Sequence, residues 1–131
     1  MEEKKEMLTE QELPSLVGAE PIELAKAIAA RLDDKKGQGV KVLAVADKTS
    51  IADYFVLGTG NSGTHVKALA GEIEDYIGKR GVDADNVEGR GMRSWIVLDY
   101  GNVIVHVFDR ESREFYNLDK LYGDAKVVLE Y

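Results

Sequence analysis

The segment "WIVLDYGNVIVHVF", residues 95–108, carries the strongest pattern in the chain and decides its predicted fold. β-branched and aliphatic residues flank a Tyr-Gly pair on both sides, which predicts a β-hairpin. If Tyr100 and Gly101 are the central turn residues, Trp95 pairs with His106 across the hairpin. A three-residue turn with a bulge at Gly101 is the alternative.

The two-residue turn sorts the hairpin into an aliphatic face and a mixed face. The aliphatic face holds Ile96, Leu98, Val103, Val105 and Val107, and the mixed face holds Trp95, Val97, Asp99, Asn102, Ile104 and His106. The mixed face is therefore partly solvated or carries hydrogen-bonded buried groups. Asp99 and His106 are either structural or part of a docking surface. Catalysis is disfavoured, because no nucleophile or second carboxylate is placed beside them.

Helical and strand patterns continue on both sides of the hairpin. Apolar residues at helical spacing and runs of β-branched residues predict helices in 21–37, 66–77 and 117–122 and strands in 40–47, 53–60 and 84–89. Strands joined by short turns pair antiparallel, and the long second helix permits one parallel crossover. The predicted fold class is α/β (α+β), a small mixed sheet of about five strands flanked by helices.

Length and composition bound the functions that the chain can have. The chain has 131 residues, 44% of them hydrophobic, and no cysteine, so we expect one domain without disulfides or thiolate metal sites. With only His65 and His106 present, we expect no metal and no cofactor. No apolar run spans a bilayer and the N-terminus lacks a signal sequence, which predicts a cytoplasmic protein.

Charge and domain limits follow from the same sequence. The net charge of −7 disfavours direct nucleic-acid binding and favours a basic partner. Residues 1–20 hold six acids and two bases, which predicts an acidic, mobile or loosely docked arm. The predicted domain spans 21–126, and the tail at 127–131 is either an edge strand or disordered.

The glycine loop "GTGNSG", residues 58–63, matches G-x-G-x-x-G between a predicted strand and a predicted helix. Asp83 follows at about the spacing of a ribose-binding acid, so nucleotide or dinucleotide binding is an alternative function. The stretch "GVDADNVEG" lacks the aliphatic run of a second parallel strand, however. A tight turn that begins a helix is the simpler interpretation.

Four stretches together resemble the Iojap or ribosomal silencing factor (RsfS) family over about residues 21–126. They are "KTSIADYFVLGTGNSGTHV", "VEG" at 87–89, "SWIVLDYGNVIVHVF" and "SREFYNLDKLYGDA", in the family's order and spacing. The resemblance implies a nucleotidyltransferase-like fold without its paired catalytic acids, and no enzyme. It implies a homodimeric repressor of translation under nutrient limitation. Such a factor binds the large ribosomal subunit through its fourteenth protein and blocks joining with the small subunit.

The family pattern also implies which residues dock. Carried onto this sequence, it assigns partner binding to Trp95, Asp99, Tyr100 and His106, with Arg113, Tyr116 and Tyr122 as neighbours. Two positions depart from the pattern: Asn102 replaces the second acid of a D-x-G-D turn, and Tyr122 stands where tryptophan is common. A further family motif is matched by residues for which we expect a structural role: Thr59, Gly60, Ser62 and His65.

Overall fold

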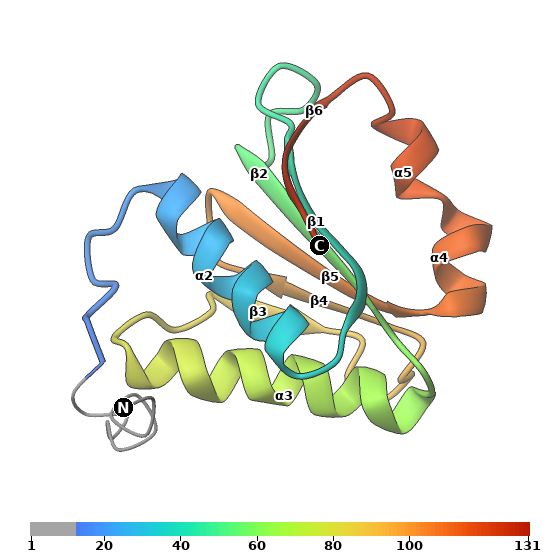
Figure 1. The fold of residues 1–131 in the computed structure, drawn as a ribbon, viewed down its shortest axis with the longest axis horizontal. Coiled ribbons are helices and arrows are strands. Elements are labelled where there is room, and N and C mark those ends of the chain that lie inside the picture. The colour runs from blue at the N-terminus through green and yellow to red at the C-terminus, as the bar shows by residue number, and fades with distance from the viewer. Residues whose placement is uncertain (1–12) are drawn as a thin grey trace.

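A six-stranded mixed sheet forms the centre of the protein in a computed structural model that describes residues 13–131. The strands lie in the order β3-β4-β5-β2-β1-β6 (Figure 1). They are β1 (Gln38–Ala44), β2 (Tyr54–Gly60), β3 (Asn86–Glu88), β4 (Trp95–Asp99), β5 (Val103–Asp109) and β6 (Lys126–Glu130). The helices are α2 (Pro21–Asp34), α3 (Gly63–Lys79), α4 (Arg110–Tyr116) and α5 (Leu118–Leu121).

The strand pairing confirms the predicted mixed sheet. β1 pairs antiparallel with β2, β3 with β4, and β4 with β5, whereas β2 and β5 run parallel. The crossover between the parallel strands contains α3, β3 and β4. The sixth strand, β6, is formed by the tail and pairs antiparallel with β1 at the sheet edge. Of the two states considered for residues 127–131, the edge strand is the one observed.

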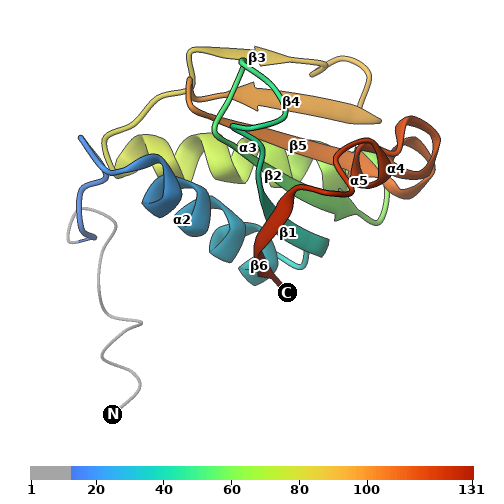
Figure 2. The same ribbon diagram turned by 90° about the horizontal axis from the view of Figure 1, so that it is seen from above.

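The two faces of the sheet are covered to different extents. α2 and α3 lie side by side on one face (Figures 1 and 2), and their apolar stripes pack with the aliphatic face of the hairpin in the larger core. A smaller core on the opposite face is centred on Phe55, Leu57 and Phe108 and is bordered by Leu118 and Tyr122 of the C-terminal segment. Burial of apolar area on both faces stabilises the sheet.

The centre of the hairpin turn lies one residue further along the chain than predicted. Tyr100 N–H donates to the Val103 carbonyl at 2.9 Å, so Gly101 and Asn102 form the centre of the turn, and Gly101 has a φ of 86°. Trp95 consequently pairs with Phe108, not with His106. The predicted register is therefore wrong by two residues. Because side chains alternate with a period of two, this shift leaves the assignment of the two faces unchanged.

The segment before α2 lies against the end of α3. Leu16 is buried, its N–H donates to the Arg80 carbonyl at 2.7 Å, and Arg80 Nε donates to the Pro14 carbonyl at 2.9 Å. Residues 1–12 of the predicted arm lie outside the described residues. Among the helices of residues 13–131, none has the length and apolar character needed to cross a bilayer.

Candidate docking surface

Seven aromatic rings gather on the face of the sheet that α2 and α3 do not cover. Trp95 of β4 stacks on Phe108 of β5 with ring centroids 5.3 Å apart and contacts Tyr116 of α4 at 4.5 Å. His106 lies 4.8 Å from Phe55 of β2. We call the group the aromatic face; its members are Phe55, Trp95, His106, Phe108, Phe115, Tyr116 and Tyr122.

Trp95 and His106 are joined by a hydrogen bond within this group. The indole N–H of Trp95 donates to Nδ1 of His106 at 3.2 Å. Because Nδ1 accepts, the neutral ring carries its proton on Nε2, and Nε2 has no partner among the described residues. Burial lowers the pKa of His106 from 6.5 to about 4, so the ring is neutral near pH 7. This state suits a structural acceptor better than an acid–base catalyst.

The outer part of the aromatic face is exposed to solvent. Phe115 is 78% exposed, Tyr116 is 51% exposed, and Leu121 on α5 is 69% exposed. Phe115 packs edge-on against Tyr116 with ring centroids 5.0 Å apart. Aromatic side chains thus extend from half-buried Trp95 to Phe115 on α4, and Leu121 is a further exposed apolar side chain on α5. Exposed aromatic groups that adjoin a rigid sheet are the usual anchors of protein interfaces.

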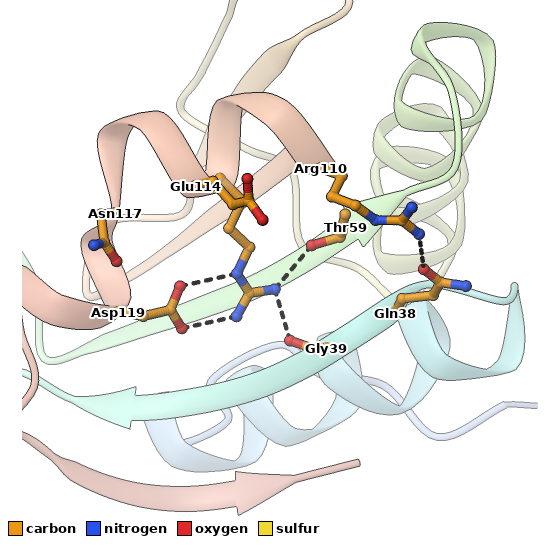
Figure 3. Close-up of a pocket in the computed structure, with 8 residues that line it drawn as sticks. Gln38, Gly39, Thr59, Arg110, Glu114, Asn117 and Asp119 are labelled. Carbon is orange, nitrogen blue, oxygen red and sulfur yellow. Dashed lines mark hydrogen bonds and ion pairs between the residues drawn. The ribbon is translucent and has the colours of Figure 1, made fainter.

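Arg113 holds α4 and α5 to the sheet at the wall of a cavity of about 360 Å³ (Figure 3). Its Nε and Nη2 donate to the two carboxylate oxygens of Asp119, each at 2.9 Å. Its Nη1 donates to the Gly39 carbonyl at 2.8 Å and to Thr59 Oγ1 at 2.9 Å. The hydrogen bonds from Arg113, followed by those from Lys41, hold the pKa of Asp119 far below its usual range.

The structure brings together only some of the residues that the family resemblance assigns to docking. Trp95 contacts both His106 and Tyr116, and Tyr122 is linked to His106 through Phe55, whose ring centroid lies 5.0 Å from that of Tyr122. Three other assigned residues do not join this group. Tyr100 lies in the larger core, Asp99 bonds to the turn and Arg113 bonds to Asp119.

Tyr100 does not lie with Trp95, which corrects the expectation that the two are presented together. It is buried in the larger core, on the helix-covered face, because the turn begins after it and β-strand alternation directs it there. Asp99 remains at the turn end of the mixed face, where its carboxylate accepts from the Gly101 N–H at 2.8 Å. Arg113 is only 14% exposed and its guanidinium is bound within the fold.

Sequence reasoning missed Phe115 and Leu121 as surface residues. The short helix predicted near 117–122 is confirmed as α5 (Leu118–Leu121), whereas α4 (Arg110–Tyr116), which precedes it and is joined to it at Asn117, was not predicted. The sequence feature that indicates an exposed aromatic residue here is the adjacent pair Phe115 and Tyr116. Neighbouring side chains on a helix point about 100° apart, so both cannot face the same sheet.

The glycine loop serves packing and helix capping. A Cβ on Gly60 would lie 2.8 Å from the Val66 nitrogen, and one on Gly58 would lie 3.2 Å from Leu32. Ser62 Oγ caps α3 by accepting from the His65 N–H at 3.1 Å. These contacts agree with the structural role expected for this loop.

Asp83 is placed far from the glycine loop. It lies beside Gly78, near the C-terminal end of a helix of 17 residues, whereas the loop precedes the N-terminal end. At 1.5 Å per residue the two ends are about 25 Å apart. Asp83 therefore does not have the position of a ribose-binding acid in a dinucleotide fold. Within residues 13–131 no group of three or more His, Cys, Asp or Glu residues is arranged to hold a metal ion.

Comparison with known proteins identifies the family. The sequence model described as "Ribosomal silencing factor during starvation" (RsfS) matches residues 18–130. The ribosomal silencing factor RsfS of Bacillus subtilis is 39% identical over 105 residues, which are 80% of this chain and 89% of that protein. The chloroplastic protein Iojap of Zea mays is 30% identical over 110 residues, which are 84% of this chain and 48% of that protein.

A solved structure has the same fold. The crystal structure of a protein from Chromobacterium violaceum matches with a TM-score of 0.76 and 33% sequence identity, over 79% of this chain and 87% of that one. The family model and the relatives together cover the sheet, the helices and the aromatic face. They confirm the resemblance carried by the four stretches between residues 21 and 126, and the chain belongs to the ribosomal silencing factor (RsfS) family.

Proposed function

We propose that this protein represses translation without catalysing a reaction, by binding the large ribosomal subunit in the cytoplasm when nutrients are scarce. Its contact on the subunit is the fourteenth protein, at the face that meets the small subunit. The bound domain then excludes the small subunit sterically. The observation that carries the proposal is the aromatic face, a partly exposed apolar surface built on a rigid sheet in a chain of the RsfS family.

The size of the protein suits a mechanism of occlusion. A standard interface covers about 800 Å² on each partner, which is roughly a tenth of the 7556 Å² surface of the protein. The remaining surface projects from the ribosome and obstructs a competing subunit. Affinity comes chiefly from a few central aromatic residues, so Trp95 and Tyr116 are the proposed anchors.

Charge supports the same type of partner. The net charge of −7 favours association with a basic surface and raises the association rate at low salt. Asp99, at the turn end of the mixed face, supplies one negative charge there, whereas Asn102 supplies none. We propose that the free protein is a homodimer, as the family resemblance implies. Sedimentation of the free protein at several concentrations tests that proposal.

Sedimentation with separated ribosomal subunits tests the function. Wild-type protein is expected to sediment with the large subunit and to reduce the yield of joined ribosomes. Trp95→Ala is expected to lose both effects. Val17→Ala is the matched control, because Val17 is an apolar residue that is 69% exposed and lies beside Gly81 at the end of α3.

The controls distinguish docking from folding. Far-UV circular dichroism of Trp95→Ala shows whether its fold is kept. If wild-type protein fails to bind the large subunit, or binds without affecting subunit joining, the proposed function is wrong. If Trp95→Ala is folded and binds like wild type, the aromatic face is not the docking surface.

A further inference from the structure

The helices that carry the outer part of the aromatic face have little apolar support of their own. Neither α4, with 7 residues, nor α5, with 4 residues, contains a fully buried residue. Nevertheless α4 holds Tyr116 at 4.5 Å from Trp95. Short helices without a buried face are marginal by themselves. Leu118 of α5 borders the smaller core, so it is α4 above all that needs a further interaction to fix its position.

Arg113 supplies such an interaction from the middle of α4. Four hydrogen bonds extend from its guanidinium to three separate elements: two to Asp119 on α5, one to Gly39 on β1 and one to Thr59 on β2 (Figure 3). Thr59 is itself buried, at 6% exposure, so the guanidinium is anchored to the rigid part of the sheet. Bidentate pairing of arginine with a carboxylate is among the strongest and most directional side-chain contacts.

Asp119 extends this connection to β1. Its Oδ1 also pairs with Lys41 Nζ on β1 at 2.8 Å. Asn117, between the two helices, has a φ of 50°, and its side chain accepts from the Lys120 N–H at 3.2 Å. The bend between α4 and α5 is thus set locally by Asn117, while the pair Arg113–Asp119 ties both helices to β1 and β2.

We infer that Arg113 is a positioning residue of the docking surface: its ion pair with Asp119 holds Tyr116 against Trp95 and Phe115 toward solvent, and it acts on the partner only through them. The effect of Arg113 on binding rests on the proposed function, whereas its effect on the position of Tyr116 does not. The inference replaces the direct contact that the family resemblance implies for Arg113. With a side chain only 14% exposed and four hydrogen bonds made inside the fold, the guanidinium has little capacity left for a partner.

Optical signals of Trp95 test the positioning separately from docking. Trp95 is the only tryptophan in the chain, so near-UV circular dichroism and fluorescence report its contact with Tyr116. Arg113→Met is expected to change both signals and to weaken binding to the large subunit about tenfold. A tenfold loss corresponds to a protein in which Tyr116 lies against Trp95 about a tenth of the time. Arg110→Met is the matched control. Arg110 lies one turn earlier on α4, lines the same cavity and bonds to Gln38 alone among the described residues.

Asp119→Asn separates positioning from direct contact. Positioning predicts that Asp119→Asn shifts the Trp95 signal and weakens binding as Arg113→Met does, and that the double variant is no worse than either single variant. Direct contact predicts that Asp119→Asn frees Arg113, so that binding is unchanged or tighter. The inference is overturned by that result, or by an unchanged Trp95 signal in a folded Arg113→Met protein.

Failure of the proposed function has a different signature. If wild-type protein does not bind the large subunit, the function fails and the docking part of the inference fails with it, while the optical comparison still decides whether Arg113 positions Tyr116. If Trp95→Ala abolishes binding but Arg113→Met and Asp119→Asn bind like wild type, the function stands and the inference is overturned. Thermal unfolding of each variant shows whether the fold is intact.

Discussion

Trp95 and His106 lie on neighbouring strands and share one hydrogen bond, from the indole N–H to Nδ1 at 3.2 Å. The bond satisfies the only polar group of the indole inside the fold. What Trp95 offers a partner is therefore apolar ring surface, and its orientation depends on a neutral His106. His106 therefore has a structural role among the aliphatic residues of the hairpin, because it orients the tryptophan.

The lowered pKa of His106 predicts a loss of stability in mild acid. In the unfolded chain the histidine binds a proton below pH 6.5, whereas the folded protein keeps it neutral down to about 4. The contribution of His106 is thus fully present above pH 6.5 and is lost as the pH falls toward 4. Between pH 7.5 and pH 5 the free energy of unfolding should fall by about 2 kcal/mol from this group alone.

Urea unfolding at both pH values measures this effect, with His106→Phe as the comparison. Other titrating groups are common to both proteins, so they cancel in the difference between the two pH dependences. The variant should lose about 2 kcal/mol less than wild type over this pH range. Equal pH dependence in the two proteins would show that His106 is not held neutral by the fold.

The sequence was sufficient to assign the faces of the hairpin but not its turn. Alternation from Trp95 to Val107 identifies the faces, and an error of two residues in register leaves them unchanged. The turn position depends on which residues adopt unusual backbone angles, and Tyr-Gly and Gly-Asn are both plausible turn centres by composition. The displaced turn is what moves Tyr100 from the predicted surface into the core.

Tyr100 provides a test of that corrected position. Its hydroxyl is buried without a partner among the described residues, and burial, followed by the charges of Glu74 and Asp83, raises its pKa well above the usual range. Removing an unpaired buried hydroxyl relieves its desolvation cost, so Tyr100→Phe should raise the free energy of unfolding by about 1 kcal/mol. Denaturant unfolding measures this change. Ribosome binding should stay the same, and weaker binding would return Tyr100 to the docking residues.

Gly60 of the glycine loop and Gly71 of α3 should respond in opposite ways to substitution by alanine. Gly60→Ala places a Cβ 2.8 Å from the Val66 nitrogen and 2.9 Å from its side chain, and the start of α3 must shift. Overpacking of this kind costs about 1–3 kcal/mol. Gly71, inside α3, has nothing within 4 Å of its Cβ position, and alanine there should stabilise the helix by about 0.5–1 kcal/mol. Thermal unfolding compares the two variants, and a harmless Gly60→Ala would contradict the packing role.

The candidate site was less predictable than the sheet, because it depends on how distant segments meet. The family resemblance groups Arg113, Tyr116 and Tyr122 with the hairpin, but it does not show that Arg113 turns inward to Asp119. Nor does it show that Phe115 faces solvent. Both facts follow from the position of two short helices, which is set by a few polar contacts and not by an apolar periodicity.

The exposure of Phe115 predicts that stability and docking respond differently to its removal. Because Phe115 is 78% exposed, Phe115→Ala should change the free energy of unfolding by no more than about 0.5 kcal/mol. If Phe115 is buried against the large subunit, the same change should weaken binding by about 2 kcal/mol, roughly thirtyfold. Quantitative sedimentation with the large subunit measures the loss, and Val17→Ala, at 69% exposure, should bind like wild type. Unchanged binding of Phe115→Ala would confine the docking surface to the part of the aromatic face around Trp95.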